Sequence, residues 1–259
     1  MVSSSVPRKI LGVIPARISS SRFPGKVLAP LASKPLLEHV WGRASLSRYL
    51  TNIIIATDDS RVYETARGFG ATVRMTRADH PTGTDRVAEV ASAENAEIIV
   101  NIQGDEPLID PAAIDAAILP LVHDPDIVMG TLMKRIEDPR EIDDPNVVKV
   151  VTDLHGDAIY FSRSAIPFVR DAAAVQPKPA YFKHIGLYVY RRDFLLGYSE
   201  LPVGPLEQAE RLEQLRAIEN GFRIRVVETE YDSLGVDTPA DLERAEALFA
   251  ASTVLGVKS

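Results

Sequence analysis

The stretch VIPARISSSRFPGK, residues 13–26, is the feature around which the rest of this chain is organised. An apolar run over residues 10–14 predicts a buried strand that stops at Pro15. The loop after it carries hydroxyl groups, small residues and three cations, and then a second apolar run begins. Hydroxyls and cations directly after a strand favour a polyanion, most often a phosphate group. A solvated connection is the alternative interpretation.

The loop fits neither of the two common phosphate-binding motifs. A Walker A loop needs a glycine five residues before Gly25, where Ser20 stands. It also needs a serine or threonine after Lys26, where Val27 stands. No GxGxxG fingerprint follows the strand. From the residues alone, phosphate binding and a plain surface connection therefore both stay open.

Outward from this loop, the first half of the chain alternates apolar runs of strand length with helical patterns. The patterns predict strands at residues 9–14, 52–56, 72–75 and 98–102, and helices at residues 35–46, 60–69, 85–93 and 111–119. Such alternation predicts βαβ units and a mostly parallel α/β sheet. Ligands of these sheets bind beyond the carboxyl ends of the strands. One rim is therefore expected to gather the loops at residues 16–26, 57–59, 77–86 and 103–107.

The middle third has a different pattern. Strands without long helices between them are predicted at residues 127–133, 147–152, 158–162 and 185–190. A hairpin turn at residues 153–157 indicates an antiparallel extension of the sheet, which is also a plausible dimer surface. Further predictions are a mobile loop at 170–180, one amphipathic helix at 205–220, a strand at 222–228 and a last helix at 240–250.

Composition excludes several classes of function. The net charge of −7 and the pI near 5.3 argue against general nucleic-acid binding, which leaves a basic footprint. The sequence has no cysteine, which excludes disulfides, thiol nucleophiles and thiolate zinc sites. No apolar stretch approaches the roughly 18 residues of a membrane span, and no signal peptide is evident. We expect a soluble cytoplasmic protein with no membrane insertion.

Two aspartates stand just outside predicted elements. Asp105 follows a strand and Gly104, which places its carboxylate on the ligand rim. Asp237 precedes the last helix, where Thr238 is the better N-cap and leaves Asp237 to point elsewhere. Carboxylates that face phosphates can hold Mg²⁺. A turn or helix-end role is the alternative for both, and sequence by itself does not bring the two acids together.

The loop at residues 77–86 combines donors, hydroxyls and a glycine ahead of a helix, which suits a base or a phosphate. The alternative is a capped loop with surface charges. His80 and His184 are candidate metal ligands or acid/base groups, although a lone histidine is more often structural. The chain has no HExxH pair and no GxSxG elbow, so neither a zinc protease nor an α/β-hydrolase is indicated.

Taken together, blocks along nearly the whole chain resemble the 3-deoxy-manno-octulosonate cytidylyltransferases, also called CMP-Kdo synthetases. The blocks lie at residues 13–26, 76–90, 100–107, 148–151 with 160–167, 183–191, 212–216 and 235–242. CMP-sialate synthetases share the fold and a related first loop, but lack TRADHPTGTDR and LEQLR in this form. The combination of blocks is highly specific, and residues 170–180 are the least family-like piece.

The resemblance implies a Rossmann-like, mostly parallel sheet of the nucleotide-diphospho-sugar transferase type, with an antiparallel extension that forms a dimer surface. It implies one nucleotidyltransferase domain over residues 1–259, with a dimerisation and sugar-binding excursion at about 131–190, and a homodimer. The implied reaction joins CTP and Kdo to give CMP-Kdo and pyrophosphate for lipopolysaccharide synthesis, with Mg²⁺ as cofactor. A related acid sugar as acceptor (8-amino-Kdo or a sialic acid) and a non-catalytic nucleotide-binding protein are the alternatives.

The resemblance also implies roles for individual residues. Catalysis is implied for Arg17, Lys26, Asp105 and Asp237, and Mg²⁺ binding for the two aspartates. Nucleotide contacts are implied for Pro15, Ala16, Arg17, Ser20, Gly25, Lys26, Arg77, Thr82, Gly83 and Thr84. Kdo contacts are implied for Gln103, Arg163, His184, Tyr188, Glu213 and Gln214.

Overall fold

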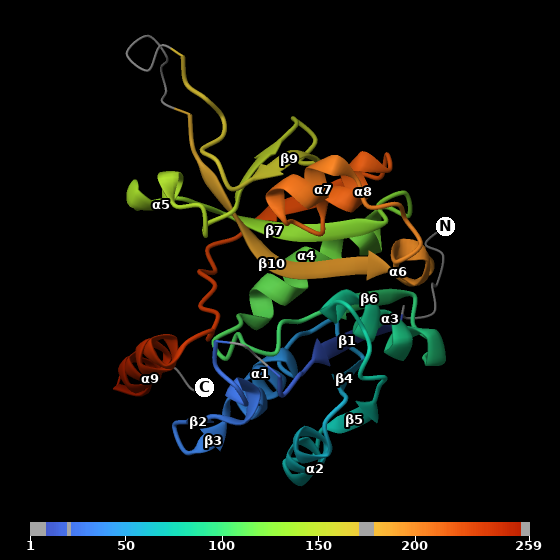
Figure 1. The fold of residues 1–259 in the computed structure, drawn as a ribbon, viewed down its shortest axis with the longest axis vertical. Helices are drawn as coiled ribbons and strands as arrows, with labels where there is room; N and C mark the ends of the chain where they lie inside the picture. The colour runs from blue at the N-terminus through green and yellow to red at the C-terminus, as the bar shows by residue number, and fades with distance from the viewer. Residues whose placement is uncertain (1–8, 20–21, 171–178, 255–259) are drawn as a thin grey trace, which may run out of the picture. The chain divides into compact units, whose positions relative to one another are not determined.

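The computed structural model describes residues 9–19, 22–170 and 179–254, with side chains up to residue 250. The chain divides into two compact units (Figure 1), the first formed by residues 1–115 and 233–259 and the second by residues 116–232. The excursion predicted at about 131–190 lies inside the second unit. A single domain over the whole chain stays a prediction.

The first unit is built on four parallel strands. They are β1 (Ile10–Pro15), β4 (Asn52–Thr57), β5 (Thr72–Met75) and β6 (Ile98–Asn101), and they pair in the order β6–β1–β4–β5. Val13 on the central strand β1 lies opposite Ile54 on one side and Asn101 on the other. The parallel sheet predicted from the alternating pattern is confirmed.

Helices of the first unit follow the predicted order. They are α1 (Leu36–Ala44), α2 (Ser60–Gly68), α3 (Gly83–Ala93) and α9 (Pro239–Val254). On α1, the side chains of Leu36, Leu37 and Val40 have no exposed surface, as their helical spacing predicts. Burying side chains of this size stabilises the fold by about 1.5–3 kcal/mol each.

Two features of the first unit were not predicted. A short 3₁₀ helix η1 (Lys26–Leu28) ends the first loop, and Gly25 enters it with a left-handed backbone at φ 77°. A small hairpin follows, formed by β2 (Pro30–Leu31) and β3 (Lys34–Pro35). Its turn holds Ala32 and Ser33 at positive φ, where neither residue gives the usual glycine signal for a turn.

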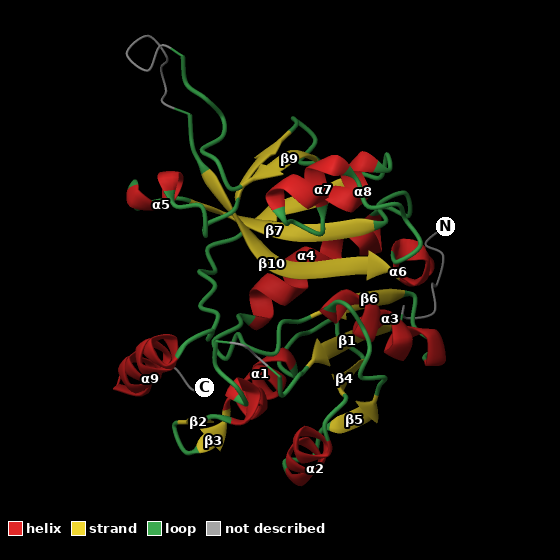
Figure 2. Cartoon of the chain, viewed as in Figure 1, coloured by secondary structure: helices red, strands yellow, loops and turns green. Residues whose placement is uncertain are grey.

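The second unit is dominated by antiparallel pairs, as predicted. Strand β10 (Phe182–Arg191) pairs antiparallel with β7 (Met129–Arg135), and β11 (Ile224–Glu228) adds to β7 in parallel. Strands β8 (Lys149–Thr152) and β9 (Ala158–Ser162) form the predicted hairpin (Figure 2). Gly156 lies in its turn at φ 81°. Helix α4 (Pro111–His123) contains the boundary between the units and continues through Pro120. Two short helices, α5 (Arg140–Asp143) and α6 (Arg192–Tyr198), were not predicted.

The single helix predicted at residues 205–220 is wrong. The structure has two short helices there, α7 (Pro205–Glu210) and α8 (Leu215–Glu219). Arg211 separates them with a left-handed backbone (φ 55°, ψ 44°). The apolar stripe predicted one continuous buried face, but its first member, Leu206, is 40% exposed. The break follows Glu210, whose carboxylate accepts hydrogen bonds from the β9 end, so tertiary contacts override the periodicity.

The mobile loop predicted at residues 170–180 falls mostly on 171–178, outside the described residues. Over the part of the chain that the structure describes, none of the helices combines the length and the apolar character that crossing a membrane requires.

Candidate active site

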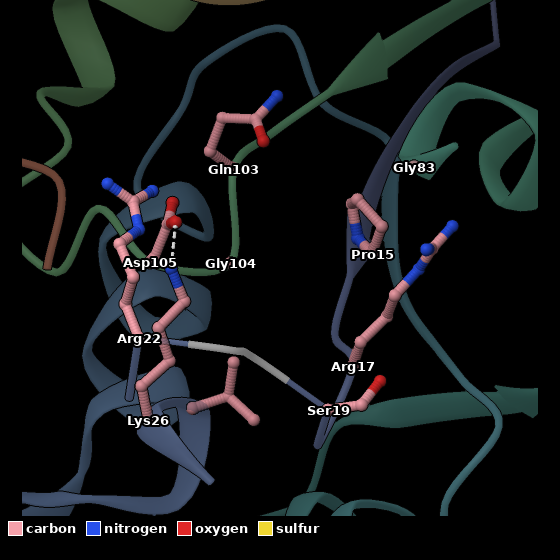
Figure 3. A pocket seen from close by; sticks show the side chains of 10 residues that line it. Pro15, Arg17, Ser19, Arg22, Lys26, Gly83, Gln103, Gly104 and Asp105 are labelled. Atoms are coloured by element: carbon pink, nitrogen blue, oxygen red, sulfur yellow. Dashed lines mark hydrogen bonds and ion pairs between the residues drawn. The ribbon is translucent and has the colours of Figure 1, made fainter. Parts of the chain in front are cut away.

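A cleft of about 390 Å³ opens in the first unit beyond the carboxyl ends of β1 and β6. Three of the four loops predicted to share this rim line it, whereas none of its described lining residues comes from the loop at 57–59. In Figure 3, Lys26, Arg22 and Asp105 lie on one side, facing Pro15, Arg17 and Ser19 on the other. The full lining is Pro15, Arg17, Ser19, Arg22, Lys26, Val27, Gly83, Gln103, Gly104 and Asp105.

The ammonium group of Lys26 joins the two aspartates that the sequence singles out. Its Nζ lies 2.6 Å from Asp105 Oδ2 and 2.8 Å from Asp237 Oδ1. The Lys26 side chain is 12% exposed, against 28% for Asp105 and 39% for Asp237. Burial lowers the pKa of Lys26, but the two carboxylates outweigh it and raise the pKa above its ordinary value. Two acids separated by 132 positions in the sequence thus meet at one cation.

The backbone explains why Asp237 reaches this point. The N–H of Val236 donates to the carbonyl of Asp105 (2.8 Å), which ties the two segments together. Thr238 then caps α9: its hydroxyl accepts from the Asp241 N–H (3.3 Å), and the Asp241 carboxylate accepts from the Thr238 N–H (2.9 Å). The predicted N-cap is confirmed, and it leaves the Asp237 carboxylate to contact Lys26 and Arg22, the latter at 2.8 Å.

Glycine is required next to Asp105 for a steric reason. A Cβ on Gly104 would lie 2.7 Å from the carbonyl oxygen of Pro15, a backbone atom that cannot turn away. The ends of β6 and β1 therefore touch at this residue, which holds Gln103 and Asp105 in the cleft beside the first loop. Ala16, predicted to contact the nucleotide, is buried, and its N–H donates to the carbonyl of Ala56 (2.8 Å).

Arg17 is held at the cleft by the loop before α3. Its Nη2 donates to the carbonyl of His80 (3.1 Å). Burial lowers the pKa of Arg17, and the positive charge of Arg86 adds to this, while Asp58 and Asp85 oppose it. The guanidinium nevertheless stays charged, because an arginine titrates far above neutral pH.

The four nucleotide candidates around α3 have different surroundings. Gly83 lines the cleft, and a Cβ on it would lie 3.7 Å from Cγ of Pro15. Thr82 caps α3 in a capping box with Asp85, and Thr84 is buried. Arg77 pairs with Asp79 at 2.9 Å, is 67% exposed and is not among the residues that line the cleft. Ser20 lies outside the described residues.

Of the sugar candidates in the second unit, His184 and Tyr188 lie side by side on β10 with ring centroids 5.3 Å apart. His184 Nε2 is hydrogen-bonded to the Thr131 hydroxyl (2.9 Å), and burial lowers the pKa of His184 to about 3. Burial also raises the pKa of Tyr188, with further contributions from Tyr198 and Glu213. The charge of Glu213 therefore acts on Tyr188.

The remaining sugar candidates border the break between α7 and α8. Arg163 Nε donates to the carbonyl of Glu210 (2.8 Å), and its Nη1 donates to the carbonyl of Pro145 (2.9 Å). Glu213 accepts a hydrogen bond from the Tyr198 hydroxyl through its carbonyl (2.7 Å), and Gln214 is 4% exposed. The break in the predicted helix therefore determines where Glu213 and Gln214 lie.

Residue-by-residue reasoning missed three cleft residues, Ser19, Arg22 and Val27. Membership of the first loop was the available signal for Ser19 and Arg22, with positive charge as a second signal for Arg22, whereas Val27 follows the loop and lies in η1. It also gave no sign that the side chain of Arg86 has no exposed surface and that its Nη2 lies 3.1 Å from Asp58 Oδ2. A buried arginine on a helix has no signature in the sequence of a single chain.

Comparisons with known proteins agree with this geometry. A family model described as cytidylyltransferase matches residues 11–225. The chain is 76% identical over 252 residues to a 3-deoxy-manno-octulosonate cytidylyltransferase of Solibacter usitatus, covering 97% of this chain and 99% of that protein. It is 56% identical over 242 residues to the protein of that name from Geobacter sulfurreducens, covering 91% and 97%.

A solved structure gives the same result in three dimensions. It is a CMP:2-keto-3-deoxy-manno-octonic acid synthetase complexed with CTP, which matches with a TM-score of 0.90 and 44% sequence identity. The match covers 94% of this chain and 99% of that one. The chain therefore belongs to the family of 3-deoxy-manno-octulosonate cytidylyltransferases.

Proposed function

We propose that this chain transfers CMP from CTP to the anomeric 2-hydroxyl of Kdo and releases pyrophosphate. Membership of the family supports the reaction class. At the level of residues, the observation that carries the proposal is the meeting of Lys26, Asp105 and Asp237 beside the cleft, at 2.6 and 2.8 Å. In this reaction the sugar oxygen attacks the α-phosphorus in line as pyrophosphate leaves, so positioning and charge stabilisation dominate over covalent catalysis.

The first loop supplies the site for the triphosphate. Arg17, Arg22 and Lys26 bring three positive charges to one cleft, and Ser19 adds a hydroxyl group. Arginine recognises phosphate oxygens in pairs, whereas lysine acts as a point charge. These cations offset the negative charge of the nucleotide and of the departing pyrophosphate. The missing Walker glycine matters less here, because side-chain cations take the place of a backbone cradle.

The two aspartates fit a magnesium ion. Among the described residues, no group of three or more His, Cys, Asp or Glu side chains could hold a metal ion. Mg²⁺ does not need such a cage, since it binds through one or two carboxylates together with phosphate oxygens and water. Asp105 and Asp237 already converge on the cation of Lys26, so both can face one positive charge. When bound, Mg²⁺ would polarise the phosphate and lower the charge that the sugar oxygen meets.

Within the second unit, the residues proposed to contact the acceptor sugar are Arg163, His184, Tyr188, Glu213 and Gln214. Kdo carries a carboxylate, which a guanidinium such as that of Arg163 can bind, and several hydroxyl groups, which need acceptors and donors. With its pKa lowered to about 3, His184 is neutral at physiological pH and can share hydrogen bonds without a charge.

Three further properties belong to the same proposal. The product would enter lipopolysaccharide synthesis, the enzyme would work in the cytoplasm, and it would act as a homodimer. Exposed apolar side chains support a protein contact in the second unit: Leu154 is 104% exposed, Phe168 87% and Ile159 57%.

Pyrophosphate release tests the proposal directly. We expect release with CTP but not with ATP, GTP or UTP, and only when Mg²⁺ and an acceptor are present. Kdo, 8-amino-Kdo and N-acetylneuraminate are compared as acceptors, because these sugars differ by few groups. Faster turnover with either analogue than with Kdo would show that the analogue is the substrate. CTP binding without release for any acceptor would favour a non-catalytic nucleotide-binding protein.

A further inference from the structure

The carboxylate of Glu89 on α3 holds the loop that precedes that helix. Its Oε2 accepts a hydrogen bond from the backbone N–H of Arg77 (3.1 Å) and also contacts the ring Nε2 of His80. The His80 side chain is only 8% exposed, so its ring nitrogen depends on this acceptor, whereas Glu89 is 34% exposed. One carboxylate oxygen thus fixes both ends of the segment from Arg77 to His80.

The same segment holds Arg17 from its other side. The carbonyl of His80 accepts a hydrogen bond from Arg17 Nη2 (3.1 Å), and Arg17 lines the cleft. The donors of a guanidinium form a rigid fork, so fixing one of them sets the direction of the others. A chain of contacts therefore runs from Glu89 through His80 to Arg17.

We propose that Glu89 is a positioning residue for Arg17, because it fixes the carbonyl that aims the Arg17 guanidinium at the triphosphate. This inference rests on the proposed function, since it takes CTP as the ligand of the cleft. Glu89 is not among the residues that line the cleft, so it acts through Arg17 rather than by contact. Its contribution is preorganisation: an arginine already held in place loses less side-chain freedom when the nucleotide binds.

Calorimetric binding of CTP tests the proposal. Glu89→Ala removes both contacts, and we expect the dissociation constant to rise about tenfold, the scale of one hydrogen bond to a charged group. Glu89→Gln keeps an oxygen with two lone pairs, which can accept from both donors, so it should restore most of the affinity. The matched control is Glu94→Ala, which removes a carboxylate paired with Arg74 (3.0 Å) at the end of the same helix and should leave CTP binding unchanged.

A double variant separates positioning from general structural support. In an Arg17→Met background, Glu89→Ala should not weaken CTP binding further, because the residue that it positions is gone. An equal loss in both backgrounds would overturn the proposal, as would a Glu89→Ala protein that binds CTP like the Glu94→Ala control. Pyrophosphate release by the unmodified chain tests the proposed function separately. If release fails while CTP still binds, the role of Glu89 is still decided by how much Glu89→Ala raises the CTP dissociation constant with and without Arg17.

Discussion

Two lysines in different regions of the molecule have nearly the same surroundings. Lys26 in the first unit and Lys183 in the second are each 12% exposed, and each contacts two carboxylates. Lys26 meets Asp105 and Asp237 at 2.6 and 2.8 Å, and Lys183 meets Glu141 and Asp232 at 2.9 and 2.8 Å. In both cases burial lowers the pKa and the acids outweigh it, so that both pKa values are raised.

The difference between the two lies in where the backbone places them. Lys26 begins a 3₁₀ helix in the loop after β1 and lines a cleft, where the carboxyl ends of parallel strands gather ligands. Lys183 lies within β10, where the strand register places it opposite Lys134 on β7 and Lys149 on β8. The ion pairs alone therefore do not distinguish the two lysines. The position of Lys26 on the rim of a parallel sheet is what makes it a candidate.

The sharpest test of this comparison removes the acids. We expect Asp105→Ala and Asp237→Ala each to lower pyrophosphate release by about 10²–10³-fold or more, the loss seen when a preorganised charge stabiliser is removed. Circular dichroism should show that both variants stay folded. The matched control, Asp232→Ala, removes an acid from Lys183 and should keep its turnover. Near-normal release by either the Asp105 or the Asp237 variant would contradict metal binding by that acid.

The next largest effect is expected when Lys26 is replaced by alanine, with the same replacement of Lys183 as the control. Lys26→Ala should lower kcat/KM for CTP. The ratio to the unmodified protein should correspond to ~1.5–3 kcal/mol of lost transition-state stabilisation, as for a lost hydrogen bond to a charged group. Lys183→Ala should leave the CTP dependence unchanged, because its partners are Glu141 and Asp232. Steady-state kinetics over a range of CTP concentrations measures both. If the two variants behaved alike, the position of Lys26 on the rim would carry no functional meaning.

A pair of glycines extends the comparison to the backbone. Gly104→Ala would place a Cβ 2.7 Å from the carbonyl oxygen of Pro15, whereas a Cβ on Gly186 of β10 meets nothing within 4 Å. We expect Gly104→Ala to lower the free energy of unfolding by about 1–3 kcal/mol, the usual cost of overpacking, and to weaken CTP binding. Gly186→Ala serves as the control in urea unfolding. Equal stability of the two variants would show that β1 and β6 can separate without cost.

The smallest expected effect concerns the residue next to Lys183. Burial lowers the pKa of His184 from an ordinary 6.5 to about 3, so between these values the unfolded chain binds a proton that the native chain does not. Stability from this group is therefore present above pH 6.5 and is lost as the pH falls towards 3. Comparing unfolding near neutral pH and at about pH 5, the loss should be about 1–2 kcal/mol smaller in His184→Gln. An identical loss in both proteins would mean that His184 already titrates normally.

Local patterns predicted the first unit well and the second unit less well. The helical spacing of Leu36, Leu37 and Val40 and the cap at Thr238 depend on neighbours in the chain, so the sequence displays them directly. The break at Arg211 depends on Glu210 accepting hydrogen bonds from the distant Ser162 and Arg163. Periodicity cannot register such a contact, because it counts only residues on one helix.

Three features could be predicted from residue order alone: the alternation of strands and helices, the cationic loop at residues 13–26, and Asp105 and Asp237 as separate candidates. Spacing and residue type encode those features, since they act over a few positions. The folded chain was needed to show that Lys26 joins the two aspartates and that the His80 carbonyl holds Arg17. These meetings depend on the register of parallel strands and on the hydrogen bond from Val236 to Asp105, which link segments far apart in the chain.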